Sequence, residues 1–187
     1  MTVTTLDPMT ALIVVDLQKG VVSLPGGAHP MEDVVERACA LATVFRRHGL
    51  PVVLVNVAGG APGRTEQQRT RQDLPAGWTD LIPELNQQPR DHVVTKRTPG
   101  AFTRTDLEAH LRSLEVTQVV IAGVATSNGV EVTARQAYEL GLNVTLATDA
   151  MTDLHSDAHT WSVTRVFPRI GETGTTQNII NLLERNA

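Results

Sequence analysis

The sequence predicts an α/β fold, a three-layer arrangement in which helices cover both faces of a mostly parallel β-sheet. Apolar runs of strand length recur along the chain, and segments with helical periodicity lie between them. Strands that alternate with helices form βαβ crossovers, which make neighbouring strands parallel. The runs are rich in β-branched residues and nearly continuous, as expected for strands buried on both faces. With 187 residues, the chain is predicted to be one domain over residues 1–187.

The elements follow from these two periodicities. The apolar runs predict strands over Ala11–Val15, Pro51–Ala58, His92–Thr95 (the weakest), Val116–Val124 and Asn143–Ala147. Helical spacing predicts helices over Met31–His48, from Thr105 onward, from Ser127–Gly129 to before Gly141, over Ser156–Val166 and over Thr176–Glu184. The helix from Thr105 is expected to begin with a capping box, in which Thr105 and Glu108 satisfy free backbone amides.

The longest stretch without periodicity is Gly59–Gly77, which is rich in Gly, Pro, Arg and Gln and directly follows a predicted strand. A loop of this length inside a compact domain is either functional or disordered. We therefore expect it to cover an active site.

Composition excludes several classes of partner. A net charge of −4 gives no basic surface, so nucleic acid is not expected as a partner. No apolar run approaches the roughly 20 residues that span a bilayer. The first ten residues lack the basic segment and apolar core of a signal peptide, so a cytoplasmic protein is expected. Cys39 is the only cysteine, so no internal disulfide can form. It is expected to be a small core residue.

Three features that can carry chemistry lie at predicted strand ends. Asp16 ends the first strand, Lys96 closes the strand over residues 92–95, and the turn Gly123–Gly129 leads from a strand into a helix. Ligands of open α/β sheets bind outside the carboxyl ends of the strands. A carboxylate, an ammonium group and the free N–H groups of a helix start are therefore expected to meet at one edge of the sheet.

Each feature alone also has a structural explanation. An aspartate after a strand often caps the next turn, and a lysine at a strand end is often a solvated charge. Glycine marks many tight passages from strand to helix. Only the combination of the three favours a functional site.

The segments that carry these features resemble the isochorismatase-like, or cysteine-hydrolase, superfamily. The matching segments are Val14–Gln18, Lys96–Phe102, Gly123–Glu131 and Thr148–Ala150, and the resemblance covers nearly the whole chain. It implies a Rossmann-like sheet of about six parallel strands and an Asp-Lys-Cys catalytic triad. It also implies a non-proline cis peptide bond in the third segment, which we place at Val124–Ala125.

By this resemblance, the aspartate of the triad falls on Asp16, the lysine on Lys96 and the cysteine position on Gly129. Without a thiolate there is no covalent enzyme intermediate. Glycine also occupies this position in the true isochorismatases of the superfamily. There an aspartate protonates an enol ether, and water captures the resulting oxocarbenium ion. Asp16 would then donate the proton, while Lys96 would hold a carboxylate or other oxygen of the substrate.

The resemblance also assigns residues to substrate binding. The backbone at Ala125 and Gly129 is expected to bind a substrate oxygen, and Thr126, Gln18 and Phe102 are expected near it, although core packing explains Phe102 equally well. True isochorismatases carry an aromatic residue and a histidine at positions 125 and 127, where this chain has alanine and serine, so the substrate stays open. No histidine evident in the sequence activates the hydroxyl of Thr126 or of its neighbour at 127.

No metal and no cofactor is predicted. The nicotinamidase type of the superfamily binds a metal through an Asp-x-His motif after the second strand, but residues 56–71 contain no histidine. His155 and His159 have the i, i+4 spacing of zinc ligands, with Asp153 and Asp157 interleaved. Acidic residues at a helix start are favoured by the helix dipole, and this explanation is preferred.

The sequence therefore predicts a hydrolase that cleaves an enol ether or a C–N bond in a small, anionic substrate by Asp/Lys acid–base chemistry. The alternative is a catalytically silent family member that binds a small molecule or acts as a scaffold. A dinucleotide-binding oxidoreductase is disfavoured, because Leu17–Gly20 after the first strand is not a GxGxxG turn. The resemblance also implies a homo-oligomer, a dimer or larger.

Overall fold

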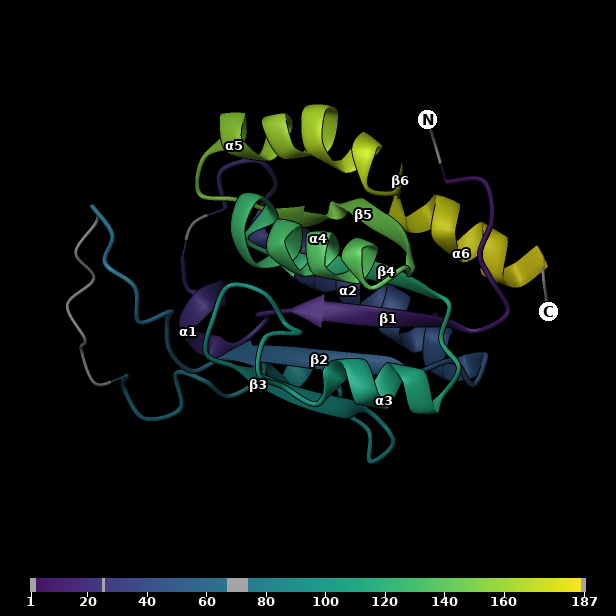
Figure 1. Ribbon diagram of the computed structural model, residues 1–187, viewed down its shortest axis with the longest axis horizontal. Coiled ribbons are helices and arrows are strands. Elements are labelled where there is room, and N and C mark those ends of the chain that lie inside the picture. The colour runs from purple at the N-terminus through teal and green to yellow at the C-terminus, as the bar shows by residue number, and fades with distance from the viewer. Residues whose placement is uncertain (1–2, 25, 67–73, 186–187) are drawn as a thin grey trace.

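The computed structural model describes residues 3–24, 26–66 and 74–185 (Figure 1). Six strands form one sheet in the order β3-β2-β1-β4-β5-β6, and every neighbouring pair is parallel. The strands are β1 (Thr10–Val15), β2 (Val52–Val57), β3 (His92–Lys96), β4 (Gln118–Val124), β5 (Asn143–Thr152) and β6 (Glu172–Gly174). The predicted fold class is confirmed.

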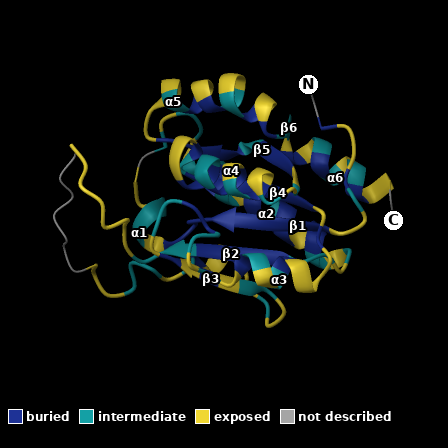
Figure 2. Ribbon diagram, in the orientation of Figure 1, coloured by how far each residue is buried: buried dark blue, intermediate teal, exposed yellow. Residues whose placement is uncertain are grey.

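Helices cover both faces of this sheet (Figures 1 and 2). One buried cluster joins the sheet to α2 (Met31–Arg47) and α6 (Thr176–Arg185). The other joins it to α3 (Leu107–Ser113), α4 (Glu131–Glu139) and η4 (Phe167–Arg169). The remaining helical segments are α1 (Lys19–Val22), η1 (Pro83–Leu85), η2 (Thr126–Val130), α5 (Ser156–Trp161) and η3 (Ser162–Val166). Each face of the sheet thus has its own core.

The two central strands, β1 and β4, lie very close together at Gly123. Its φ of +115° lies in the region that favours glycine, and a Cβ there would meet the carbonyl oxygen of Val15 at 2.0 Å. Glycine at 123 therefore allows β4 to pair with the end of β1, directly before Asp16.

Several details differ from the sequence-based expectations. β5 runs to Thr152 because its pairing with β4 shifts register past Ile121, and the short elements β6 and α1 were not predicted. Only half of the predicted capping box forms: the Thr105 hydroxyl oxygen accepts the N–H of Leu107 at 3.4 Å, while its hydrogen goes to the carbonyl of Ala101. Glu108 binds Arg112 one turn later, because an ion pair on the exposed helix face is available to it.

Two further differences concern Cys39 and the predicted covering loop. Cys39 is half-buried at the edge of a core cluster rather than inside it, and its thiol donates to the carbonyl of Glu84 at 3.2 Å. In the predicted covering loop, residues 67–73 lie outside the described residues and residues 60–66 are exposed, so its covering role stays a prediction. Among the described helices, none has the length and apolar character needed to cross a membrane.

Candidate active site at the carboxyl edge of the sheet

Parallel strands end at the same edge of a sheet, and this edge brings Asp16 and Lys96 together. Asp16 directly follows β1, and Lys96 is the last residue of β3, with β2 between them. The Lys96 Nζ lies 2.8 Å from the Asp16 Oδ2. Asp16 is only 6% exposed and Lys96 only 1% exposed, so the ion pair is buried. A solvated strand-end charge is therefore not the right description of Lys96.

Neither charged group is fully satisfied by the described residues. The Lys96 ammonium, which has three hydrogens to donate, uses one on Asp16 and one on the carbonyl of Pro99 at 2.6 Å. The Oδ1 atom of Asp16 is buried and has no hydrogen-bond partner in the described part of the chain. A buried polar atom without a partner is costly in a protein that has no use for it. The pair retains one donor and one acceptor for a ligand.

The carboxyl group of Asp16 is electrostatically unusual. Burial raises its pKa from 3.8 to about 6, although the charge and the hydrogen bond of Lys96 act in the opposite direction. Desolvation of the carboxylate thus outweighs the attraction of the ammonium group. A side chain whose pKa lies near the working pH can both give and take a proton, which is the property of a general acid or base.

Gly129 lies directly against this pair. A Cβ at position 129 would lie 3.2 Å from the Asp16 Oδ2, 3.2 Å from the Lys96 Nζ and 3.1 Å from the carbonyl oxygen of Val124. Any side chain at this position would therefore touch both charges. Glycine keeps this position free of a side chain that would press on the two charged groups.

The turn that carries Gly129 also presents backbone donors. The peptide bond between Val124 and Ala125 is cis, as predicted. The N–H groups of Asn128 and Val130 donate to the carbonyl of Ala125. No described residue accepts a hydrogen bond from the N–H of Ala125 or of Thr126. Two backbone donors thus remain near the end of β4.

Sequence reasoning missed the contacts that hold this turn. The Thr126 Oγ1 lies 2.8 Å from the Nδ1 of His159, so the expectation that no histidine reaches this hydroxyl is wrong. The Ser127 hydroxyl donates to the Oδ2 of Asp153 at 2.8 Å. The i, i+4 histidines were the available signal, but only the pairing of β4 with β5 places His159 beside the turn. No group of three metal-ligating side chains occurs among the described residues.

The side chains of Gln18 and Phe102 have hydrogen-bond or packing partners of their own. The buried Gln18 amide binds the backbone of Val57 through both its oxygen and its nitrogen, and it donates to the carbonyl of Trp78. It therefore anchors the segment around Trp78 to the end of β2. Phe102 packs against the core of α3 and α4 and lines a cavity of about 290 Å³ in which neither Asp16 nor Lys96 takes part. A part for Gln18 and Phe102 in substrate binding stays a prediction.

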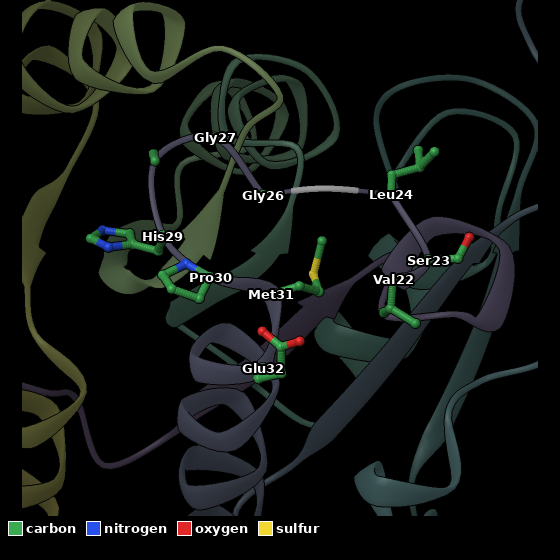
Figure 3. A pocket seen from close by; sticks show the side chains of 10 residues that line it. Val22, Ser23, Leu24, Gly26, Gly27, His29, Pro30, Met31 and Glu32 are labelled. Carbon is green, nitrogen blue, oxygen red and sulfur yellow. The ribbon is translucent and has the colours of Figure 1, made fainter.

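A larger cavity, of about 580 Å³, is formed by residues 22–24 and 26–32 between α1 and the start of α2 (Figure 3). In this view His29 stands on one side of the cavity, and Val22 and Leu24 stand on the other. Its wall is tied to the end of β5, because the N–H of Gly27 donates to the carbonyl of Asp153 at 2.7 Å. The cavity thus borders the same edge of the sheet, but Asp16 and Lys96 do not line it.

Comparison with known proteins gives consistent matches over nearly the whole chain. A family model described as the isochorismatase domain matches residues 10–178. The isochorismatase family protein YecD of Escherichia coli O157:H7 is 38% identical over 181 residues, covering 93% of this chain and 96% of YecD. YwoC of Bacillus subtilis, from the same family, is 38% identical over 178 residues, covering 91% of this chain and 92% of YwoC. A solved structure of an isochorismatase family protein from Burkholderia thailandensis has a TM-score of 0.94 at 39% identity, covering 98% of this chain and 100% of that one.

Proposed function

Because the chain belongs to the isochorismatase family of hydrolases, we propose that it hydrolyses a small anionic molecule without a cysteine nucleophile. Asp16 is the acid–base group, and Lys96 is its electrostatic partner. The bond that is cleaved is the C–O bond of an enol ether or a C–N bond. The observation that carries this proposal is the buried ion pair of Asp16 and Lys96 beside Gly129, a position without a side chain.

The first step of enol-ether hydrolysis suits the pKa of Asp16. With a pKa of about 6, roughly a tenth of the Asp16 side chains carry a proton at pH 7. The protonated carboxyl gives this proton to the vinyl carbon and leaves an oxocarbenium ion. The resulting carboxylate is stabilised by the Lys96 ammonium at 2.8 Å. Water then adds to the oxocarbenium carbon and returns a proton to Asp16, and the hemiketal product separates into an alcohol and a carbonyl compound.

The anionic character of the substrate is supported by the unused donors. The third hydrogen of Lys96 and the N–H groups of Ala125 and Thr126 have no acceptor among the described residues. A carboxylate or a developing negative oxygen accepts hydrogen bonds of this kind more strongly than a neutral oxygen does. Asp16 is the one acidic group in direct contact with Lys96 in the described structure, and a substrate anion would share that ammonium with it.

A family member that binds a small molecule without turnover is the competing interpretation. Binding alone explains the Asp16 oxygen that has no partner among the described residues, but it gives no reason for a carboxyl group whose pKa is raised to about 6. The raised pKa favours catalysis over silent binding.

The test is a screen of enol-ether carboxylates, N-carbamoyl compounds and amides with the wild-type protein, Asp16→Asn and Lys96→Met. For any substrate that is turned over, we expect both variants to lose at least about 100-fold in kcat/KM, as is typical when a general acid or its partner is removed. The matched controls are Asp80→Asn and Lys19→Met, which disrupt an exposed ion pair of 3.0 Å. Equal turnover by the wild type and Asp16→Asn would overturn the proposal, and binding without turnover in every case would favour the silent alternative.

A further inference from the structure

Two side chains from the segment after β5, those of Asp153 and His159, bind the turn that contains Gly129. The carboxylate of Asp153 accepts hydrogen bonds from both the backbone N–H and the hydroxyl of Ser127, each at 2.8 Å. Asp153 is only 6% exposed. A buried carboxylate that accepts two short bonds from one residue fixes the position of that residue.

The second contact is made by His159 in α5. Its Nδ1 lies 2.8 Å from the Oγ1 of Thr126, and both side chains are buried. Burial lowers the pKa of His159, the neighbouring His29 adds to this effect and Asp153 opposes it. The ring is therefore neutral near neutral pH, so that it offers one acceptor and one donor to its surroundings.

These contacts begin where the sheet stops. The pairing of β4 with β5 ends at Val124 and Thr152. Residues 126 and 127 lie beyond the end of the ladder, so that no strand pairing holds them. Among the described parts of the chain, Asp153 and His159 are the only residues whose side chains bind Thr126 or Ser127. The position of the turn relative to β5 thus depends on them.

We infer that Asp153 and His159 are positioning residues of the site, which hold the turn so that Gly129 faces Asp16 and Lys96. Their importance for catalysis rests on the proposed function, but the geometry can be tested without a substrate. A displaced turn would open the ion pair to water, because Gly129 lies against both charges. Loss of burial would then move the Asp16 carboxyl toward its ordinary titration behaviour.

The test is an NMR titration of the Asp16 side-chain carboxyl carbon, together with the amide shift of Gly129. Asp153→Ala and His159→Ala should each lower the pKa of Asp16 by at least about half a unit from its value of about 6. Asp153→Asn and His159→Asn keep an acceptor or donor near the same place and should restore most of the wild-type value. The matched controls are Asp157→Ala and His155→Ala, which change the same residue types in the same segment without touching the turn.

A second variant approaches the contact from the other side and guards against misfolding. Thr126→Val has nearly the shape of threonine but lacks the hydroxyl, so it should reproduce the effect of His159→Ala. The double variant Thr126→Val/His159→Ala should then change the pKa of Asp16 little more than either single variant does. Unchanged pKa and amide shift in folded Asp153→Ala, His159→Ala and Thr126→Val would overturn the inference. Because these measurements use no substrate, this result is separate from the outcome of the substrate screen.

Discussion

The Nζ of Lys96 binds one carboxylate oxygen of Asp16 at 2.8 Å, while the other oxygen is buried and has no partner among the described residues. The carboxyl group is therefore asymmetric. One oxygen is neutralised by the ammonium group, and the other is left for a ligand or a proton. This asymmetry explains how the same pair can be tightly bound and still chemically available.

The first prediction concerns the stability of this pair. Lys96→Met leaves a buried carboxylate without its charge partner, which typically costs about 3–5 kcal/mol of unfolding free energy. Because Lys96 lowers the pKa of Asp16, the same change should raise that pKa above about 6. Urea denaturation at pH 8 and NMR titration measure the two effects. The double variant Asp16→Asn/Lys96→Met should recover part of the lost stability, and a double variant less stable than Lys96→Met alone would contradict this account.

The second prediction concerns the pH dependence of activity. If protonated Asp16 starts the reaction, kcat/KM should fall about tenfold per pH unit well above pH 6, because the fraction of protonated carboxyl falls in this way. Lys96→Met should move this decline to higher pH in any residual activity. A rate that rises through pH 6 would show that Asp16 acts as a base in the limiting step instead.

The third prediction concerns space at Gly129. The Cβ of Gly129→Ala would lie 3.1–3.2 Å from three polar atoms, which is tighter than ordinary contact. We expect a folded protein that has lost about 1–3 kcal/mol of unfolding free energy, as for other overpacked sites, and most of its activity. Gly60→Ala is the control, since nothing lies within 4 Å of a Cβ at that position, and it should change stability by less than about 0.5 kcal/mol.

The fourth prediction concerns a thiol at the same position. Gly129→Cys places sulfur beside Asp16 and Lys96, and a thiolate there restores a nucleophile of the kind that forms covalent intermediates. Iodoacetamide should alkylate the introduced thiol faster than Cys39, since burial raises the pKa of the Cys39 thiol. Peptide mass spectrometry measures both rates in one sample. Faster modification of Cys39 would argue against an accessible site at position 129. New amidase activity would support the assignment of this position to the active site.

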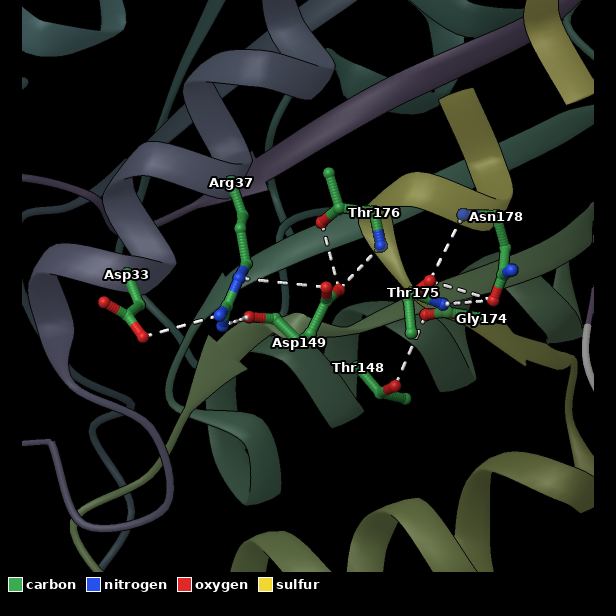
Figure 4. A network of polar contacts seen from close by, with 8 residues as sticks. All are labelled: Asp33, Arg37, Thr148, Asp149, Gly174, Thr175, Thr176 and Asn178. Atoms are coloured by element: carbon green, nitrogen blue, oxygen red, sulfur yellow. Dashed lines mark hydrogen bonds and ion pairs between the residues drawn. The ribbon is translucent and has the colours of Figure 1, made fainter. Parts of the chain in front are cut away.

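The fifth prediction concerns Asp149, which joins three elements (Figure 4). Its Oδ1 accepts the N–H of Thr176 at 2.7 Å at the start of α6, and its backbone carbonyl accepts from the Arg37 guanidinium of α2 at 2.8 Å. Asp149→Ala should cost about 0.5–2 kcal/mol of unfolding free energy, as for the loss of a helix cap. Asp33→Ala removes only a 3.4 Å contact with Arg37 and should cost less than about 0.5 kcal/mol. Equal losses in urea denaturation would contradict a capping role.

The pattern of apolar residues was enough to predict the layers of the fold. The predicted strands match β1 to β4 within about two residues, because continuous β-branched runs need burial on both faces wherever they occur. The three-residue β6 and the four-residue α1 carry too few side chains to show a period. The sequence pattern at Thr105 also did not show that Glu108 would bind Arg112 and not the backbone at the start of the helix.

The sequence by itself determined which charged groups stand at the ends of the strands and that position 129 has no side chain. The apolar runs show where each strand ends, and the ends of parallel strands lie at the same edge of a sheet. Asp16 and Lys96 are therefore expected at one edge. Only the tertiary structure decided that Gln18 binds the backbone of Val57, that Phe102 lines another cavity and that His159 reaches Thr126. It also decided the raised pKa of Asp16, because the desolvation of a carboxyl depends on everything packed around it and not on its neighbours along the chain.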